Sequence, residues 1–166
     1  RSEALLGRDN AHWSFFFNSD ASVMEGNEIQ DLGGGQFITK DAVKRYSRLD
    51  QYIMGLIPPS QVPTFFYVEP TPPTTQSRSD APQIGVSITG TRRDVLVDDV
   101  IAINGPRSPT SDATSKVHRQ AFIYIVSNGR SLDSGQVAKL DRIRTQWEGF
   151  FRQATENRMT ANTRLR

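Results

Sequence analysis

The clearest pattern of hydrophobic and polar positions lies near the end of the chain. Between residues 131 and 154, apolar side chains recur every three or four positions and would form one broad stripe on a helix. Asp133 is placed to cap the first turn with Gln136 as its reciprocal partner, and Leu132 is placed to pack on Val137. The pattern predicts a long amphipathic helix that lies across a sheet and contributes much of the stability. Its apolar stripe consists of Val137, Leu140, Ile143, Trp147, Phe150, Phe151 and Ala154.

A second helix is predicted within residues 47–59. Ser47 is suited to cap its free amides, and Asp50 follows three residues later, as in a capping box. Its apolar face would consist of Leu49, Tyr52, Ile53 and Leu56. Pro58 and Pro59 prevent the helix from continuing.

Strands are predicted where aromatic and β-branched residues alternate or cluster between turn residues. Gly33, Gly34 and Gly35 can supply the positive φ angles of a hairpin reversal. Residues 92–103 fit either a strand or a short helical turn opened by the acidic pair 98–99. The predicted strands cover residues 12–18, 22–29, 36–39, 64–69, 84–89 and 120–126, the last being the most β-prone and the expected central strand.

The order of these elements predicts the fold class. Strands mixed with a few helices, without regular alternation, favour an α+β fold. We expect a small mixed or antiparallel sheet packed by the long C-terminal amphipathic helix and one shorter helix. Residues 1–166 would form a single domain, with residues 70–83 as a Pro-rich exposed loop and residues 105–114 as a second polar loop.

Composition narrows the functional classes. The 166 residues include no cysteine and two histidines, so neither a disulfide framework nor a thiolate metal site is possible. A net charge of +2 gives no reason to expect a nucleic-acid partner. No apolar run approaches the roughly 20 residues of a transmembrane segment, so none is expected. The absence of an initial methionine indicates a processed product or a segment of a longer protein.

Candidate chemistry centres on the two histidines, His12 and His118. His12 and Ser14 would share one face of a strand, yet a nucleophilic serine needs a base held by a third group, and the motif is more typical of a structural segment. His118 is expected at the surface. The sequence lacks a His-Glu-x-x-His helix and the spacing of an EF-hand loop. No catalytic residue is therefore predicted within this chain.

Three segments together carry a resemblance to a known group of proteins. They read His12-Trp-Ser-Phe-Phe, Ser22-Val-Met-Glu-Gly-Asn27, and Tyr46-Ser-Arg-Leu-Asp-Gln-Tyr-Ile-Met-Gly-Leu56 followed by Pro58-Pro-Ser-Gln-Val-Pro63. This set resembles the region downstream of the zinc-binding helix in large secreted bacterial metallopeptidase-like proteins. It covers about a third of the chain.

The resemblance implies roles for two residues. The stretch around Met24 is similar to the Met-turn of metzincins, in which a methionine forms a floor beneath the zinc ligands. His12 would be the third zinc ligand, supplied from outside the His-Glu-x-x-His helix. Because the helix with its two histidines and its glutamate base is missing, zinc is expected only with an upstream segment, and none in the isolated chain.

Two functional hypotheses follow. The leading one is the C-terminal segment of an exported zinc-peptidase-like protein, extracellular or at the cell surface, inactive in isolation. Its partner would be the upstream part of the same polypeptide, and its substrate a protein or peptide. The alternative is a non-catalytic extracellular binding module that uses residues 13–17 or the loop 70–83 as a contact surface.

Overall fold

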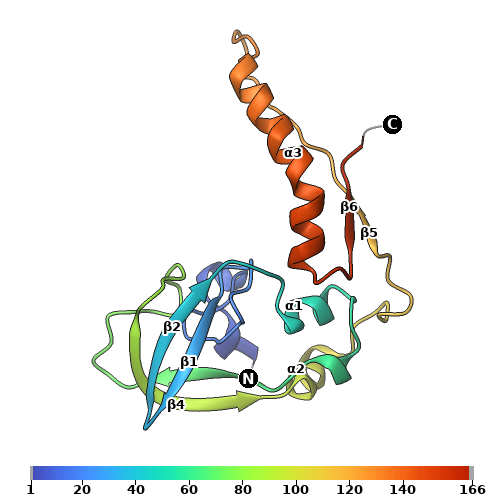
Figure 1. The fold of residues 1–166 in the computed structure, drawn as a ribbon. Helices are drawn as coiled ribbons and strands as arrows, with labels where there is room; N and C mark the ends of the chain where they lie inside the picture. Colours follow the sequence, from blue (N-terminus) through green and yellow to red (C-terminus); the bar gives the residue numbers. More distant parts are fainter. Residues whose placement is uncertain (1, 165–166) are drawn as a thin grey trace. The chain divides into compact units, whose positions relative to one another are not determined.

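A four-stranded antiparallel sheet is the framework of the first of two compact units, residues 1–114 and residues 115–166 (Figure 1). The computed structural model describes residues 2–164. The strands lie in the order β1-β2-β4-β3, and every neighbouring pair is antiparallel. Their bounds are β1 (Asn27–Gly33), β2 (Gln36–Ala42), β3 (Phe65–Pro70) and β4 (Ser87–Val95). Together with the helices, the sheet confirms the predicted α+β class.

The predicted hairpin is present between β1 and β2. Gly33 pairs with Gln36, and residues 33–35 all have positive φ, between 60° and 83°. The first strand of the hairpin, however, begins at Asn27, so the expected strand over residues 22–29 is correct only at its end. Residues 22–26 instead form a turn, in which the Gly26 amide donates to the Ser22 carbonyl at 2.9 Å.

The aromatic segment 12–18 is not a regular strand, contrary to the sequence prediction. It pairs only through isolated bridges at Trp13, Phe17 and Asn18, and a turn lies between them. The Phe17 amide donates to the Ser14 carbonyl at 3.0 Å, which closes the turn. A flat strand would point successive side chains to opposite faces. The turn instead allows all three phenylalanines, at positions 15–17, to be buried.

Helix α1 (Arg48–Ile53) begins as the sequence predicts. Ser47 Oγ accepts from the Asp50 amide at 3.1 Å, and Asp50 Oδ2 accepts from the Ser47 amide at 2.7 Å. The helix ends at Ile53, several residues before the prolines, and Gly55 follows with a φ of 73°.

The ambiguous stretch 92–103 contains both predicted alternatives. Strand β4 runs to Val95, and helix α2 (Val97–Asn104) begins with the acidic pair 98–99. Asp99 Oδ2 accepts from the Leu96 amide at 2.8 Å, which fixes the start of α2. Three short 3-10 helices complete the unit: η1 (Ser2–Leu5), η2 (Arg8–Asn10) and η3 (Pro59–Gln61). The predicted loops over residues 70–83 and 105–114 are confirmed as largely exposed irregular segments after β3 and α2.

The core of this unit consists of two hydrophobic clusters. One joins the segment 2–5 and helix α1 to β3, and the other fills the space against the four-stranded sheet. The first contains Leu5, Phe17, Leu49, Tyr52, Ile57, Phe65 and Val97. The second contains Phe15, Phe16, Ile29, Phe37, Phe66, Val68 and Ile88.

The second unit combines helix α3 (Ser134–Ala154) with two short parallel strands, β5 (Val117–Arg119) and β6 (Thr160–Asn162). The predicted central strand over residues 120–126 is wrong. The Gln120 amide donates to the Asn162 carbonyl of β6 at 3.0 Å, and within the described residues no strand pairs with residues 121–126. Ile123 and Ile125 are consequently 77% and 85% exposed.

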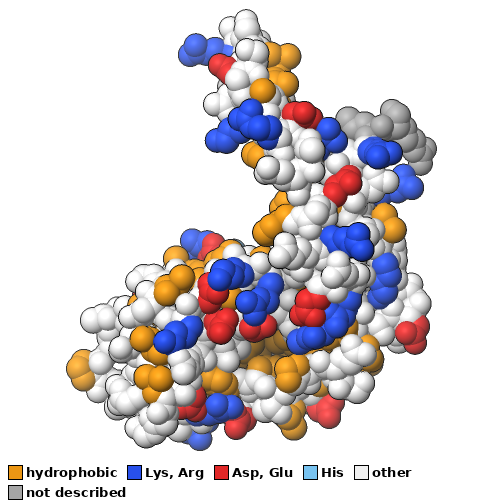
Figure 2. Space-filling view, viewed as in Figure 1, with side chains coloured by type: hydrophobic (Ala, Val, Ile, Leu, Met, Phe, Trp, Pro, Cys, Tyr) orange, Lys and Arg blue, Asp and Glu red, His pale blue; other side chains and the backbone are white. Residues whose placement is uncertain are grey.

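Helix α3 has the predicted cap, because Asp133 Oδ1 accepts from the Gln136 amide at 2.8 Å. Within this unit the helix packs against β6. Of its apolar stripe only Phe151 and Ala154 are buried, whereas Phe150 is 48% exposed. Leu132 and Val137 are also exposed, so the expected staple is not a buried contact. Hydrophobic side chains accordingly show at the surface beside Lys and Arg in Figure 2. No helix among the residues described has the length and apolar character of a membrane span.

Candidate functional site

The two residues predicted to form a metal site, His12 and Met24, line the same cavity in the first unit. The cavity has a volume of about 230 Å³, and its walls include Trp13, Tyr46, Asp50 and Ile53. Its lining is mostly apolar, with one imidazole and one buried carboxylate among the side chains. A mainly apolar cavity with a few convergent polar groups is the usual form of a ligand or active site.

A backbone hydrogen bond joins the segments that carry His12 and Met24. The Trp13 amide donates to the Met24 carbonyl at 3.1 Å, so the two segments lie side by side. The Met24 amide donates to Ser22 Oγ at 3.0 Å, which fixes the turn that carries the methionine. The Met24 side chain is 43% exposed at the cavity.

The His12 ring is oriented by a backbone carbonyl. Its Nδ1 lies 3.2 Å from the Arg8 carbonyl oxygen, which can only accept, so this contact is a hydrogen bond in the tautomer that has the proton on Nδ1. In that tautomer the lone pair is on Nε2, and Nε2 lies 3.9 Å from Glu25 Oε1. Glu25 also forms an ion pair with Arg8. Metal-binding histidines generally donate a hydrogen bond from the ring nitrogen that does not bind the metal, often to a backbone carbonyl.

Asp50 is a buried carboxylate in the cavity wall, 4% exposed. Its Oδ1 accepts from Trp13 Nε1 at 2.9 Å, and its Oδ2 accepts from Ser22 Oγ at 2.6 Å and from the Ser47 amide at 2.7 Å. Burial raises the pKa of the Asp50 carboxyl, and the hydrogen bonds from Ser22, Ser47 and Trp13 oppose that rise. Asp50 therefore connects helix α1 to the segment that contains Trp13 and, through Ser22, to the turn that carries Met24.

Sequence reasoning identified Asp50 only as a helix cap. The capping-box spacing from Ser47 signals the local bond, but nothing in the sequence pairs Asp50 with Trp13 and Ser22, which lie 37 and 28 positions away. The available signal is that each of these three residues lies in one of the three segments that carry the resemblance.

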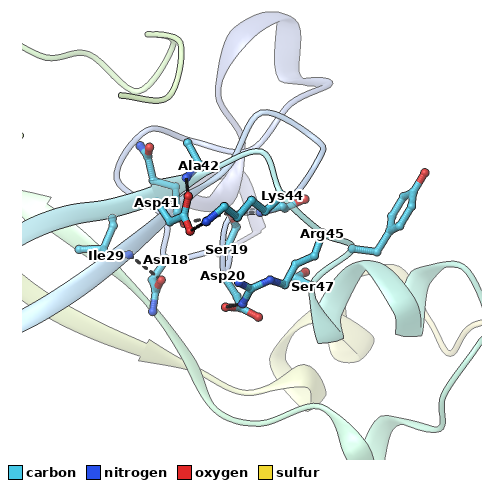
Figure 3. A network of polar contacts seen from close by, with 12 residues as sticks. Asn18, Ser19, Asp20, Ile29, Asp41, Ala42, Lys44, Arg45 and Ser47 are labelled. Carbon is cyan, nitrogen blue, oxygen red and sulfur yellow. Dashed lines mark hydrogen bonds and ion pairs between the residues drawn. The ribbon is translucent and has the colours of Figure 1, made fainter. Parts of the chain in front are cut away.

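Polar contacts join residues that flank the Met24 turn to β1 and to the segment before α1, and Figure 3 shows the contacts of Asn18, Asp20 and Arg45. Asn18 Oδ1 accepts from the Ile29 amide at 2.8 Å, and Arg45 Nη1 donates to Asp20 Oδ1 at 2.8 Å. The Val23 amide donates to the Arg45 carbonyl at 2.8 Å. Lys44 forms an ion pair with Asp41 at the end of β2, and this hydrogen bond lowers the pKa of the Asp41 carboxyl.

The donors at the cavity fit zinc in type but not in number. Imidazole nitrogen and carboxylate oxygen are common zinc ligands. His12 in the cavity wall supplies the first, and Glu25, which lies beside His12 but is not a lining residue, supplies the second. A catalytic zinc ion normally has three protein ligands. Within residues 2–164, no group of three or more His, Asp or Glu side chains is arranged to hold a metal ion.

The other candidate residues of the sequence lie elsewhere. Ser14 is buried, and its Oγ accepts from the Phe16 amide at 3.3 Å. No hydrogen bond in the described part of the chain joins either histidine to a serine. His118 belongs to the second unit, where its ring packs on Phe151 with a centroid separation of 5.9 Å.

Comparison with known proteins adds no family to this picture. No protein-family model, no curated protein and no solved structure matches the chain. The chemistry of the cavity is therefore inferred from the residues that line it.

Proposed function

We propose that residues 1–114 contain the downstream part of a zinc-peptidase-like centre, and that the chain is the C-terminal segment of an exported, extracellular or cell-surface bacterial protein of that kind. His12 Nε2 would be a zinc ligand and Met24 the floor of the site. The remaining ligands and the general base would come from an upstream part of the same polypeptide. In isolation the segment would be inactive.

One observation carries this proposal: His12 and Met24 line one cavity and lie on segments joined by the Trp13–Met24 backbone hydrogen bond. The two residues are far enough apart in the sequence that this juxtaposition is not a local effect. The Arg8 carbonyl, by holding His12 Nδ1, supports a lone pair on the opposite nitrogen.

The incomplete donor set supports a role for an upstream segment. With His12 in the cavity wall and Glu25 beside that histidine, the site needs at least one further ligand to match a catalytic zinc site. When bound, zinc lowers the pKa of its water and polarises a peptide carbonyl. No step of that chemistry is assigned to the residues of this chain beyond holding the ion.

The test uses the full-length parent protein. We expect His12→Ala to lower bound zinc and peptide hydrolysis together, by about 10-fold or more for loss of a direct ligand. His118→Ala is the matched control, because it removes the second histidine from a different unit and should leave both unchanged. Zinc content and hydrolysis that are unaffected by His12→Ala would exclude His12 from the site.

The alternative function is a non-catalytic extracellular binding module, and a specific feature of the second unit favours it. Ile123, Ile125 and Phe150 are exposed apolar side chains, and such side chains mark an interaction surface where they gather into one patch. The segment 13–17 does not serve this role, because Phe15, Phe16 and Phe17 are buried. If this alternative holds, the His12→Ala variant of the full-length parent will still bind its partner. The double variant Ile123→Lys and Ile125→Lys will no longer bind it.

A further inference from the structure

A second, larger cavity of about 430 Å³ lies beside the His12 cavity in the first unit. The two cavities share Leu6, Trp13 and Ile53 as a common wall. The indole of Trp13 is held in that wall by hydrogen bonds to Asp50 and Ser22, at 2.9 and 3.1 Å. The volume is within the range of about 300–1,000 Å³ that small-molecule sites occupy.

The lining of this larger cavity is mostly apolar and includes Leu5, Leu49 and Val100. Asn104, Arg107 and Ser108, at the end of helix α2 and just after it, contribute polar side chains. Within the described chain, Arg107 is the only charged residue among those that line the cavity.

Arg107 is held in place by bonds to the backbone and to a tyrosine. Its Nε donates to the Ile53 carbonyl at 2.6 Å, its Nη1 donates to the Ser108 carbonyl, and its amide donates to the Tyr52 hydroxyl at 3.1 Å. Among residues 2–164, no Asp or Glu forms an ion pair with Arg107. A fixed guanidinium with no acidic partner is well suited to bind a carboxylate.

We propose that this cavity binds a small aliphatic carboxylate of the fatty-acid type. The chain would lie against Leu49, Val100 and Trp13, and the carboxylate would accept hydrogen bonds from Arg107. A peptide is a poorer occupant, because its amides would be buried against an apolar wall without partners. The proposal is independent of zinc and of the proposed peptidase role.

The test is calorimetric titration of the metal-free 166-residue chain with decanoate and with decanol, its neutral counterpart. We expect saturable binding of decanoate. Arg107→Gln should weaken decanoate about 10-fold, the effect of losing a charge-assisted hydrogen bond, and should leave decanol within about twofold. Arg130→Gln, an exposed arginine of the second unit, is the matched control and should change neither.

A second variant keeps the test decisive if Arg107→Gln disturbs the fold. Val100→Phe narrows the cavity without altering Arg107 and should weaken decanoate and decanol alike. Tryptophan fluorescence in a Trp147→Phe background reports on Trp13 in the cavity wall and should change on decanoate binding. The proposal is overturned if decanoate does not saturate, if it binds Arg107→Gln as tightly as the unchanged chain, or if only a short peptide ending in leucine binds.

Discussion

Asp50 joins three segments that meet at the His12 cavity. Both of its oxygens accept hydrogen bonds, from Trp13, Ser22 and the Ser47 amide, while the side chain is almost fully buried. Removing one partner of a buried hydrogen-bond network leaves the other groups unsatisfied, which costs more than the bond itself. Asp50 is therefore expected to matter for stability as well as for the shape of the site.

The first prediction concerns the variant Asp50→Asn. An amide nitrogen replaces one accepting oxygen and faces a donor, so we expect a loss of about 1–3 kcal/mol in the free energy of unfolding. Urea denaturation of the chain measures this loss. Asp112→Asn is the matched control at an exposed position and should be neutral. Equal stability of the two variants would contradict the role assigned to Asp50.

The pH dependence of stability provides a second prediction. Because burial raises the pKa of Asp50, the folded chain binds a proton more tightly at this carboxyl than the unfolded chain does. The stability difference between the unchanged chain and Asp50→Asn should therefore shrink as pH rises from the usual carboxyl pKa through the raised one. Urea titrations of both proteins across that window measure the trend, and a difference that grows with pH would contradict it.

At this scale the sequence predicts bonds that are local and misses those that are not. The Ser47–Asp50 box is visible from its three-residue spacing, and the structure contains it. The bonds from Asp50 to Trp13 and Ser22 depend on how distant segments pack, which no spacing encodes. His12 and Met24 were linked by resemblance, and the cavity that both residues line is a property of the fold.

At the scale of elements, the stability of helix α1 depends on the cap at its N-terminus. Ser47 is buried and accepts from the Asp50 amide, so Ser47→Ala removes a cap inside the protein. We expect a loss of about 0.5–2 kcal/mol in the free energy of unfolding. Ser60→Ala, at an exposed position in η3, is the control for the same substitution. Denaturant unfolding compares them, and an unchanged midpoint for Ser47→Ala would show that the cap is dispensable.

Helix α3 offers a matched pair of neighbouring phenylalanines. Phe151 is 3% exposed, so Phe151→Ala should lower the free energy of unfolding of the second unit by about 3–5 kcal/mol. Phe150 is half-exposed, and Phe150→Ala should change the free energy of unfolding of the second unit by less than about 1 kcal/mol. Hydrogen exchange of the α3 amides measures both. Similar effects of the two substitutions would mean that the stripe is buried evenly.

The two wrong strand predictions have different physical causes. Residues 12–18 have the composition of a strand, but the Phe17 amide donates to the Ser14 carbonyl in a turn, and the three phenylalanines at positions 15–17 are buried there. Residues 120–126 have high β-propensity, but among residues 2–164 no strand pairs with residues 121–126. β-propensity reports how well a side chain fits a pleated surface, and it cannot supply the neighbouring strand.

At the scale of the whole molecule, the α+β class follows from the order of elements, and the division into units of residues 1–114 and 115–166 does not. The two predicted site residues belong to the first unit, as does the cavity with Arg107. The exposed apolar side chains at Ile123, Ile125 and Phe150 belong to the second. Folding of residues 1–166 as one domain stays a prediction.

We propose that His12 completes a zinc site whose other ligands lie upstream, and one measurement tests this directly. X-ray absorption at the zinc edge of the full-length parent protein measures the number of imidazole nitrogens bound to the ion. We expect one fewer bound imidazole nitrogen in His12→Ala than in the unchanged protein, and no change in His118→Ala. An identical zinc environment in the parent and in His12→Ala would contradict it.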